Sequence, residues 1–198
     1  MLKTTSTITK ALGLADARAE GYALDVMEGR EVVGEKIRLA VKRCISDLEA
    51  QHKGGEWVFD PEAGGKPIRF MEKFMIPQGN YDRLELMPWQ CFFISNLFGW
   101  VHRETGERKY RRATLLVAGG NGKSPMVAGL AIYCISQLGI KDCNIHVFAN
   151  SRDQAGIILE DCEAMITGSP ALSRRFKCQV KGIFFDQGGY IKGHASDA

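Results

Sequence analysis

Apolar residues recur at every third or fourth position in three parts of the N-terminal half, and this spacing predicts amphipathic helices. The first helix is predicted over residues 33–50, where the apolar positions are Val33, Ile37, Val41, Cys44, Ile45 and Leu48. A second is predicted from Ile68 to about Met75, and a third starts near Pro88 and continues through Phe92, Phe93, Leu97 and Trp100. Segment 61–67 holds two prolines and two glycines, which favours a turn-rich connector.

The C-terminal half alternates between strand-like and helix-like patterns. Short apolar runs predict strands over 112–118 and 144–149, and helical spacing follows each run, over 123–138 and 152–167. This order predicts a parallel sheet with right-handed crossovers, in which ligands bind at the carboxyl ends of the strands.

Beyond Pro170 the pattern is that of shorter strands. They are predicted over 177–181, 182–186 and 190–192, with a turn at Gln187-Gly188-Gly189, and form a hairpin or meander attached to the sheet. The predicted fold class is therefore α/β, with a parallel sheet preceded by a helical N-terminal segment.

Composition and charge narrow the function only slightly. The 198 residues, of which 45% are apolar, suit one domain or a little more with its own core. The net charge of +3 is too small to indicate nucleic-acid binding by itself. One stretch is basic, with Glu104 and Glu107 outnumbered by Arg103, Arg108, Lys109, Arg111 and Arg112. That stretch fits either a solvated turn before a strand or a contact with a phosphate backbone.

The six cysteines include no C-x-x-C pair and lie mostly in apolar segments, so we expect reduced thiols in an intracellular protein. The four histidines are scattered away from the cysteines, which does not favour a zinc site. No apolar run approaches the ~18 residues of a membrane span, and residues 1–10 lack the core of a signal peptide. We expect a soluble, cytoplasmic protein without membrane contact.

A glycine-rich loop separates the predicted strand 112–118 from the helix that follows, and its residues are Gly119, Gly120, Asn121, Gly122, Lys123 and Ser124. Glycines let a backbone fold around a polyphosphate with its N–H groups pointing inward. A lysine at this place reaches the outer phosphates, and a serine offers its hydroxyl to Mg²⁺. Nucleotide binding is therefore the first hypothesis, and a glycine-rich turn without a ligand is the alternative.

Two residues make the loop irregular. Val117 stands where the pattern G-x-x-x-x-G-K-[ST] has its first Gly. Pro125 suits the first turn of a helix, but it removes one amide that phosphate loops commonly aim at the α-phosphate.

Together, these segments resemble the large subunit of tailed-phage terminases, the ATPase that drives DNA into a procapsid. Pro88-Trp89-Gln90 resembles the family's adenine-recognition segment, and residues 117–124 resemble its phosphate loop, which also lacks the first Gly. Residues 150–155 resemble a segment that commonly reads Thr/Ser-Arg-Glu-Gln-Ala. The match runs from about residue 30 to the last residue, and residues 195–198 resemble the piece that precedes the family's acidic ATPase strand.

The resemblance implies a site for ATP and Mg²⁺. In that site Gln90 would hydrogen-bond adenine, Lys123 would neutralise β/γ-phosphate charge and Ser124 would ligate Mg²⁺. The loop backbone would hold the phosphates through Gly119, Gly120, Asn121 and Gly122. Arg152 is a candidate for contact with nucleotide, a neighbouring subunit or DNA, and the alternative is a solvated residue of a first helical turn. The family's partners are DNA, the portal protein and the small terminase subunit, and its subunits form a homo-oligomeric ring during packaging.

The resemblance also implies a domain layout, in which 1–105 is a helical lead-in and 106–198 is the first half of a P-loop ATPase domain. Gly119 stands where the family usually carries an Arg that steadies phosphate charge or couples hydrolysis to motion. The sequence given ends before the apolar strand that finishes in Asp-Glu and orients the attacking water, and before the nuclease domain. We therefore expect this chain to bind ATP-Mg²⁺ weakly if at all and not to turn it over.

Asp186 is a candidate substitute for the missing acid, but the Gly188-Gly189 turn that follows it favours a hairpin. Two other functions remain open from the sequence. One is a non-functional truncated prophage remnant, and the other is an unrelated small P-loop kinase or nucleotide-binding protein.

Overall fold

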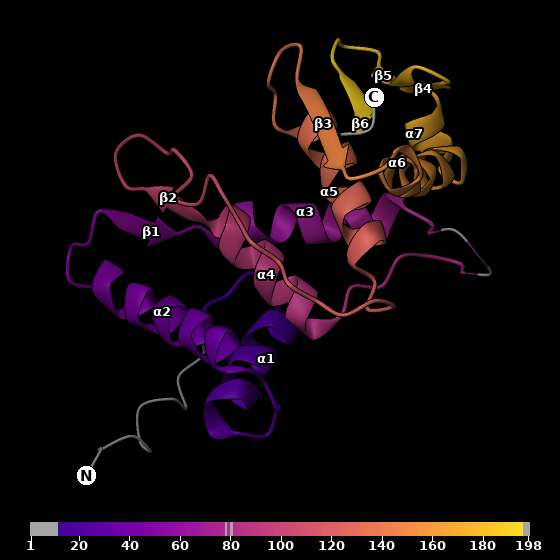
Figure 1. Cartoon of the computed structure of the whole chain (residues 1–198). Coiled ribbons are helices and arrows are strands. Elements are labelled where there is room, and N and C mark those ends of the chain that lie inside the picture. Colours follow the sequence, from indigo (N-terminus) through magenta and orange to yellow (C-terminus); the bar gives the residue numbers. More distant parts are fainter. Residues whose placement is uncertain (1–11, 78, 80, 196–198) are drawn as a thin grey trace. The chain divides into compact units, whose positions relative to one another are not determined.

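The structure is a computed structural model, and it describes residues 12–77, 79 and 81–195 (Figure 1). The chain forms two compact units. The first consists of the residues up to Ile68 together with Leu86–Leu115, and the second consists of Arg69–Glu85 together with the residues from Leu116 onward. The predictions made for residues 1–10 and for the tail residues 196–198 lie outside the described residues.

The first unit is mainly helical. Its elements are α1 (Ala17–Glu28), α2 (Glu35–Gln51), β1 (Trp57–Phe59), the start of α3 (Pro61–Phe74), α4 (Pro88–Gly99) and β2 (Trp100–His102). The strands β1 and β2 pair antiparallel, with Trp57 opposite His102. The predicted helices over 33–50 and from Pro88 are confirmed as α2 and α4.

Helix α1 was not predicted, because its buried face is made of small residues. Ala19, Ala23 and Val26 are buried on that face, and α1 packs against α4. Alanine at helical spacing gives little hydrophobic contrast in the sequence, so the pattern is weak. The helix is nevertheless well bounded, since Asp16 is its N-cap and Gly29, with φ of 77°, ends it in the left-handed conformation.

The connector predicted over 61–67 is wrong, because α3 already begins at Pro61. The Asp60 carboxylate accepts two backbone N–H groups of the first turn, at 2.9 and 3.1 Å, and proline suits the first helical position. Gly64 permits close packing, since a Cβ there would lie 3.0 Å from a backbone oxygen of α4. This proline- and glycine-rich segment is therefore the capped and closely packed first half of a helix. Pro67 lies inside that helix.

The second unit combines the end of α3 and three further α-helices with a mixed sheet. Its elements after residue 116 are α5 (Lys123–Gln137), β3 (Asn144–Ala149), α6 (Arg152–Thr167), α7 (Pro170–Ser173), β4 (Phe176–Gln179), β5 (Gly182–Phe185) and β6 (Tyr190–Ala195). The strand order is β3-β6-β5-β4, in which only the pair β3–β6 is parallel. The predicted strand 144–149, both predicted helices and the C-terminal hairpin are confirmed.

Residues 112–118 do not form the predicted strand. Among the described residues no strand pairs with them, and the Leu116 side chain is 96% exposed. Backbone N–H and C=O groups in a strand need partners on a neighbouring strand, and this apolar run has no regular secondary structure. The expectation of a parallel sheet that starts here, with the loop at the end of its first strand, is therefore wrong. The α/β class itself is confirmed.

Helix α6 packs against the sheet. It packs on β6 and β3, and α5 packs against α6. Gly193 of β6 allows this close approach, because a Cβ there would lie 3.3 Å from the Cβ of Ala155. The Cys162 thiol of α6 donates to the Ala128 carbonyl of α5 at 3.6 Å.

All six cysteines are free thiols, and Cys44, Cys91 and Cys162 are buried. Burial raises the pKa of the Cys44 and Cys162 thiols to about 12. These two thiols are therefore protonated at neutral pH and behave as core residues. None of the described helices is both long enough and apolar enough to cross a membrane.

The turn between β5 and β6 requires glycine. Gly189 has φ of 89°, and a Cβ added there would overlap the backbone carbonyl of Cys143. We predict that Gly189→Ala lowers the free energy of unfolding by about 2–4 kcal/mol, because strain and a clash with fixed backbone add.

Gly139→Ala is the matched control, since Gly139 also has a positive φ, 67°, but has no atom within 4 Å of the added Cβ. It should cost only about 1 kcal/mol. Urea unfolding of both variants measures the difference, and equal losses would show that the Cys143 contact does not restrict the turn.

Candidate nucleotide-binding site

The predicted phosphate loop lies between the irregular segment 112–118 and the first residue of α5, in the second unit. Gly120 and Gly122 have φ of 77° and 66°, in the left-handed region that glycine adopts at little cost. A Cβ on Gly119 or on Gly120 would meet no atom within 4 Å. Two residues of the loop are therefore in the left-handed conformation, and the space around the added Cβ atoms at Gly119 and Gly120 is open.

Two side chains of the loop bond to its own carbonyls. The Lys123 Nζ donates to the Val117 carbonyl at 3.1 Å. The Asn121 Nδ2 donates to the carbonyls of Ala118 and Gly119, each at 3.3 Å. These bonds close the loop on itself, and they place the lysine ammonium group beside the glycine turn.

The start of α5 supplies amides for an anion. Gly122 is the N-cap, and no side chain caps this end of the helix. The intrahelical ladder begins with the Met126 N–H bonded to the Gly122 carbonyl at 3.3 Å, while Pro125 has no N–H. The amides of Lys123 and Ser124 occupy the first helical positions, which lack intrahelical acceptors. With the helix dipole and the lysine charge, they fit a phosphate group.

Gln90 belongs to the first unit, on the first turn of α4. It is buried, with 4% of its surface exposed, and its Oε1 accepts the Met87 N–H at 2.8 Å. The side chain thus caps its own helix. Its reading of adenine stays a prediction, as does every ligand contact assigned to the loop.

Arg152 is the first residue of α6 and is exposed. The predicted cap is present before it, since the Ser151 hydroxyl accepts the Gln154 N–H at 3.3 Å. Arg152 also lines a cleft of about 360 Å³, together with residues that include Ala155, Gly193 and His194. This cleft was not predicted, because it joins the N-terminus of α6 to the end of a strand about 40 residues later.

Asp186 pairs with Arg175 at 3.3 Å, next to the β5–β6 turn. This ion pair supports the hairpin interpretation of that segment. Several cations of the basic stretch also have partners in the first unit. Arg103 donates to the carbonyls of Gly55 and Gln51 at 3.0 and 2.9 Å, and Lys109 pairs with Asp47 at 2.6 Å.

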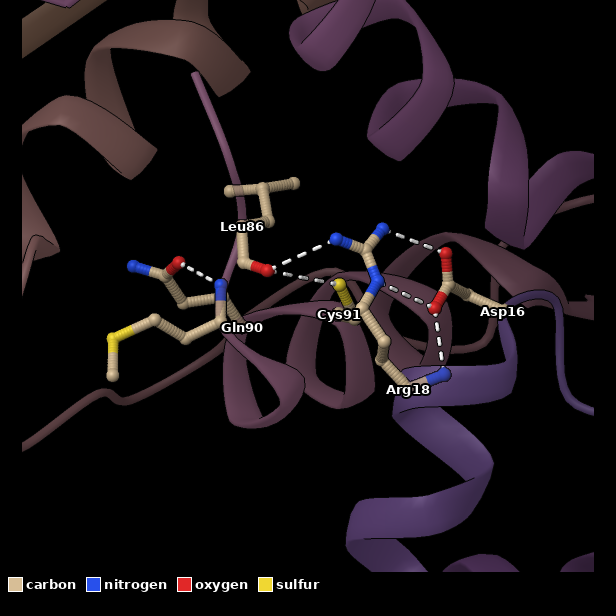
Figure 2. Close-up of polar contacts among 6 residues, drawn as sticks. Asp16, Arg18, Leu86, Gln90 and Cys91 are labelled. Carbon is tan, nitrogen blue, oxygen red and sulfur yellow. Dashed lines mark hydrogen bonds and ion pairs between the residues drawn. The ribbon is translucent and has the colours of Figure 1, made fainter. Parts of the chain in front are cut away.

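A polar network next to Gln90 was not predicted (Figure 2). The Arg18 guanidinium contacts the Asp16 carboxylate on one side and the Leu86 carbonyl on the other, at 2.9 and 3.1 Å. The sequence signals only the Asp16 cap of α1. It gives no sign that Arg18 reaches a residue 68 positions away.

The comparisons with known proteins identify the class of fold and then the family. The model of the terminase large subunit ATPase domain matches residues 88–192, and the chain belongs to that family. The crystal structure of the HK97 bacteriophage large terminase is similar in fold, with a TM-score of 0.57 and 22% sequence identity. That alignment covers 68% of this chain and 28% of the terminase chain, so the chain spans about a quarter of that relative. A search of curated proteins gives no match.

Gly120 and Gly122 have a positive φ and Gly119 does not, and this difference provides a test of the loop conformation. We predict that Gly120→Ala lowers the free energy of unfolding by about 1 kcal/mol, because alanine is strained at its φ of 77°. Gly122→Ala should behave in the same way.

Gly119→Ala is the control, since Gly119 has no positive φ and its Cβ would meet no atom within 4 Å. It should change stability by less than about 0.5 kcal/mol. Denaturant titrations of the three variants compare the losses. A cost at Gly119 equal to that at Gly120 would contradict the loop conformation.

Proposed function

We propose that this chain supplies the ATP-binding part of a terminase large subunit, the motor that packages viral DNA into procapsids. One observation carries the proposal. A glycine loop with two left-handed residues leads directly into Lys123 and Ser124 at the start of α5, inside the segment that matches the terminase ATPase family. The family match does not favour an unrelated P-loop protein.

The loop backbone and Lys123 are proposed to hold the triphosphate. Backbone N–H groups at Gly120, Asn121 and Gly122, with those of Lys123 and Ser124, provide donors in a row. Lys123 would exchange its 3.1 Å bond to the Val117 carbonyl for β/γ-phosphate oxygens. A phosphate oxygen carries more charge than a carbonyl oxygen, so this exchange is favourable.

Ser124 is the residue proposed to hold Mg²⁺, through its hydroxyl on the second helical position of α5. When bound, the ion neutralises phosphate charge. Gly119 brings no cation to the loop, which leaves Lys123 as the positively charged residue of segment 119–124. The proposal is therefore one of nucleotide binding, with hydrolysis assigned to the whole terminase subunit.

Gln90 is proposed to recognise adenine. A carboxamide can donate to N7 and accept from N6 of adenine, a pairing that guanine does not match because it carries O6 at that edge. The Gln90 Oε1 accepts the Met87 N–H at 2.8 Å. In the full-length family protein, DNA, the portal protein and the small terminase subunit are the proposed partners, within a homo-oligomeric ring.

Lys123→Ala tests the proposed site directly. We expect isothermal titration of the wild-type chain with ATP and Mg²⁺ to give a saturable signal. The variant should bind about 10- to 100-fold more weakly, because it loses a charge-assisted hydrogen bond to phosphate.

Lys141→Ala is the matched control, since Lys141 is an exposed lysine beyond the other end of α5. It should bind as the wild type does. If folded wild-type protein gives no signal at millimolar ATP, or if both lysine variants lose affinity equally, the proposed function is wrong.

A further inference from the structure

One peptide group, between Leu86 and Met87, is held at both of its ends (Figure 2). Its oxygen accepts the Arg18 Nη1 at 3.1 Å and lies 3.9 Å from the Cys91 Sγ. Its N–H donates to the Gln90 Oε1 at 2.8 Å. The guanidinium of Arg18 and the carboxamide of Gln90 are therefore connected through a single rigid plane.

Arg18 is itself fixed by Asp16. Two parallel bonds join them, from Nε to Oδ1 at 3.0 Å and from Nη2 to Oδ2 at 2.9 Å. The same Oδ1 accepts the Arg18 backbone N–H at 2.8 Å, as the N-cap of α1. A two-point Arg–carboxylate contact fixes direction as well as distance. The start of α1 thus sets where the guanidinium points.

The arrangement is partly shielded from water. Leu86 and Gln90 are each 4% exposed, whereas the Asp16 and Arg18 side chains are 19% and 37% exposed. The Arg18 guanidinium beside Asp16 holds the pKa of that carboxyl below its ordinary value of 3.8. The carboxylate is therefore ionised at neutral pH, and the stability that the pair adds is lost only as pH falls through that lowered pKa.

Hydrogen bonding determines which end of the Gln90 carboxamide faces which way. The oxygen and nitrogen ends have nearly the same shape, and the last torsion of glutamine is soft, so shape alone selects neither orientation. The Met87 N–H selects the oxygen. A cation on the oxygen of the same peptide polarises that N–H and strengthens the selection.

We propose that Asp16 and Arg18 are a positioning pair for base recognition, acting on Gln90 through the Leu86–Met87 peptide. The inference rests on the proposed function, because it assigns a specificity role next to the residue proposed to read adenine. Arg18 does not touch the nucleotide. It fixes the carboxamide in the orientation that distinguishes the amino group of adenine from the carbonyl of guanine.

The test compares affinities for ATP and GTP, each with Mg²⁺, in wild type and in Arg18→Gln. We expect the ATP affinity of the variant to fall about tenfold with little change for GTP, so that the preference for ATP is lost; the size corresponds to one well-placed polar contact. Arg30→Gln is the control, because Arg30 forms an exposed pair with Asp25 at 2.6 Å near the other end of α1. It should keep the wild-type preference.

A double-mutant cycle with Gln90→Ala separates positioning from a general structural role. If Arg18 acts through Gln90, then Arg18→Gln has no further effect on the ATP/GTP ratio in the Gln90→Ala background. Asp16→Asn, a nearly isosteric substitution, should reproduce the loss of ATP preference seen in Arg18→Gln. Arg18→Lys should keep only part of the wild-type preference, since lysine lacks the planar guanidinium group.

The outcomes are distinct from those for the proposed function. If wild type binds ATP and Lys123→Ala does not, but Arg18→Gln and Asp16→Asn keep the wild-type preference, the positioning role is wrong and nucleotide binding stands. Equal losses for ATP and GTP, or additive effects with Gln90→Ala, also overturn the positioning role. If wild type binds neither nucleotide, the proposed function itself fails.

Discussion

The site depends on a helix that begins without a side-chain cap. At the N-terminus of α5 the cap residue is Gly122, which has no side-chain oxygen to offer the first amides, and Pro125 has no amide N–H of its own. Those amides need an acceptor, since unpaired donors at a helix start are costly when they are removed from water. Gly120 and Gly122, both left-handed, lie just before the helix, and Lys123 adds a full positive charge at its start. A phosphate group would satisfy the amides, the dipole and the lysine together, as the proposed function requires.

The start of α4 also has amides without intrahelical acceptors, but there a side chain of the helix itself acts as the cap. Its N-cap amide, the Met87 N–H, donates to the side chain of Gln90 in the first turn. The carbonyl oxygen of the same peptide accepts a hydrogen bond from Arg18. The first unit thus fixes a carboxamide by closing its hydrogen bonds internally. In the second unit, no side chain caps the start of α5.

Much of the fold could be predicted from hydrophobic spacing, and the elements that were predicted wrongly or missed have physical causes. Helices α2, α4, α5 and α6 and strand β3 carry strong periodic patterns, and they lie where that spacing predicts them. Helix α1 buries alanines, which leave a weak pattern, and α3 begins in a proline- and glycine-rich segment that is ordinarily a turn. Residues 112–118 have the composition of a strand but no partner among the described residues, and composition cannot supply a partner. The loop 119–124 could be predicted because its chemistry is contiguous, whereas the Arg18 network depends on a contact over 68 positions and could not.

The central claim is that the amides of the glycine loop hold a triphosphate, and a residue-resolved titration tests it most directly. In ¹H–¹⁵N NMR spectra of the chain, a non-hydrolysable ATP analogue with Mg²⁺ should produce saturable shifts at the amides of Gly120, Asn121, Gly122, Lys123 and Ser124. Amides of β4 and β5, which lie elsewhere in the second unit, should serve as an internal reference and stay unchanged. Unperturbed loop amides at millimolar analogue in a well-folded sample, or shifts confined to other parts of the chain, would contradict the account.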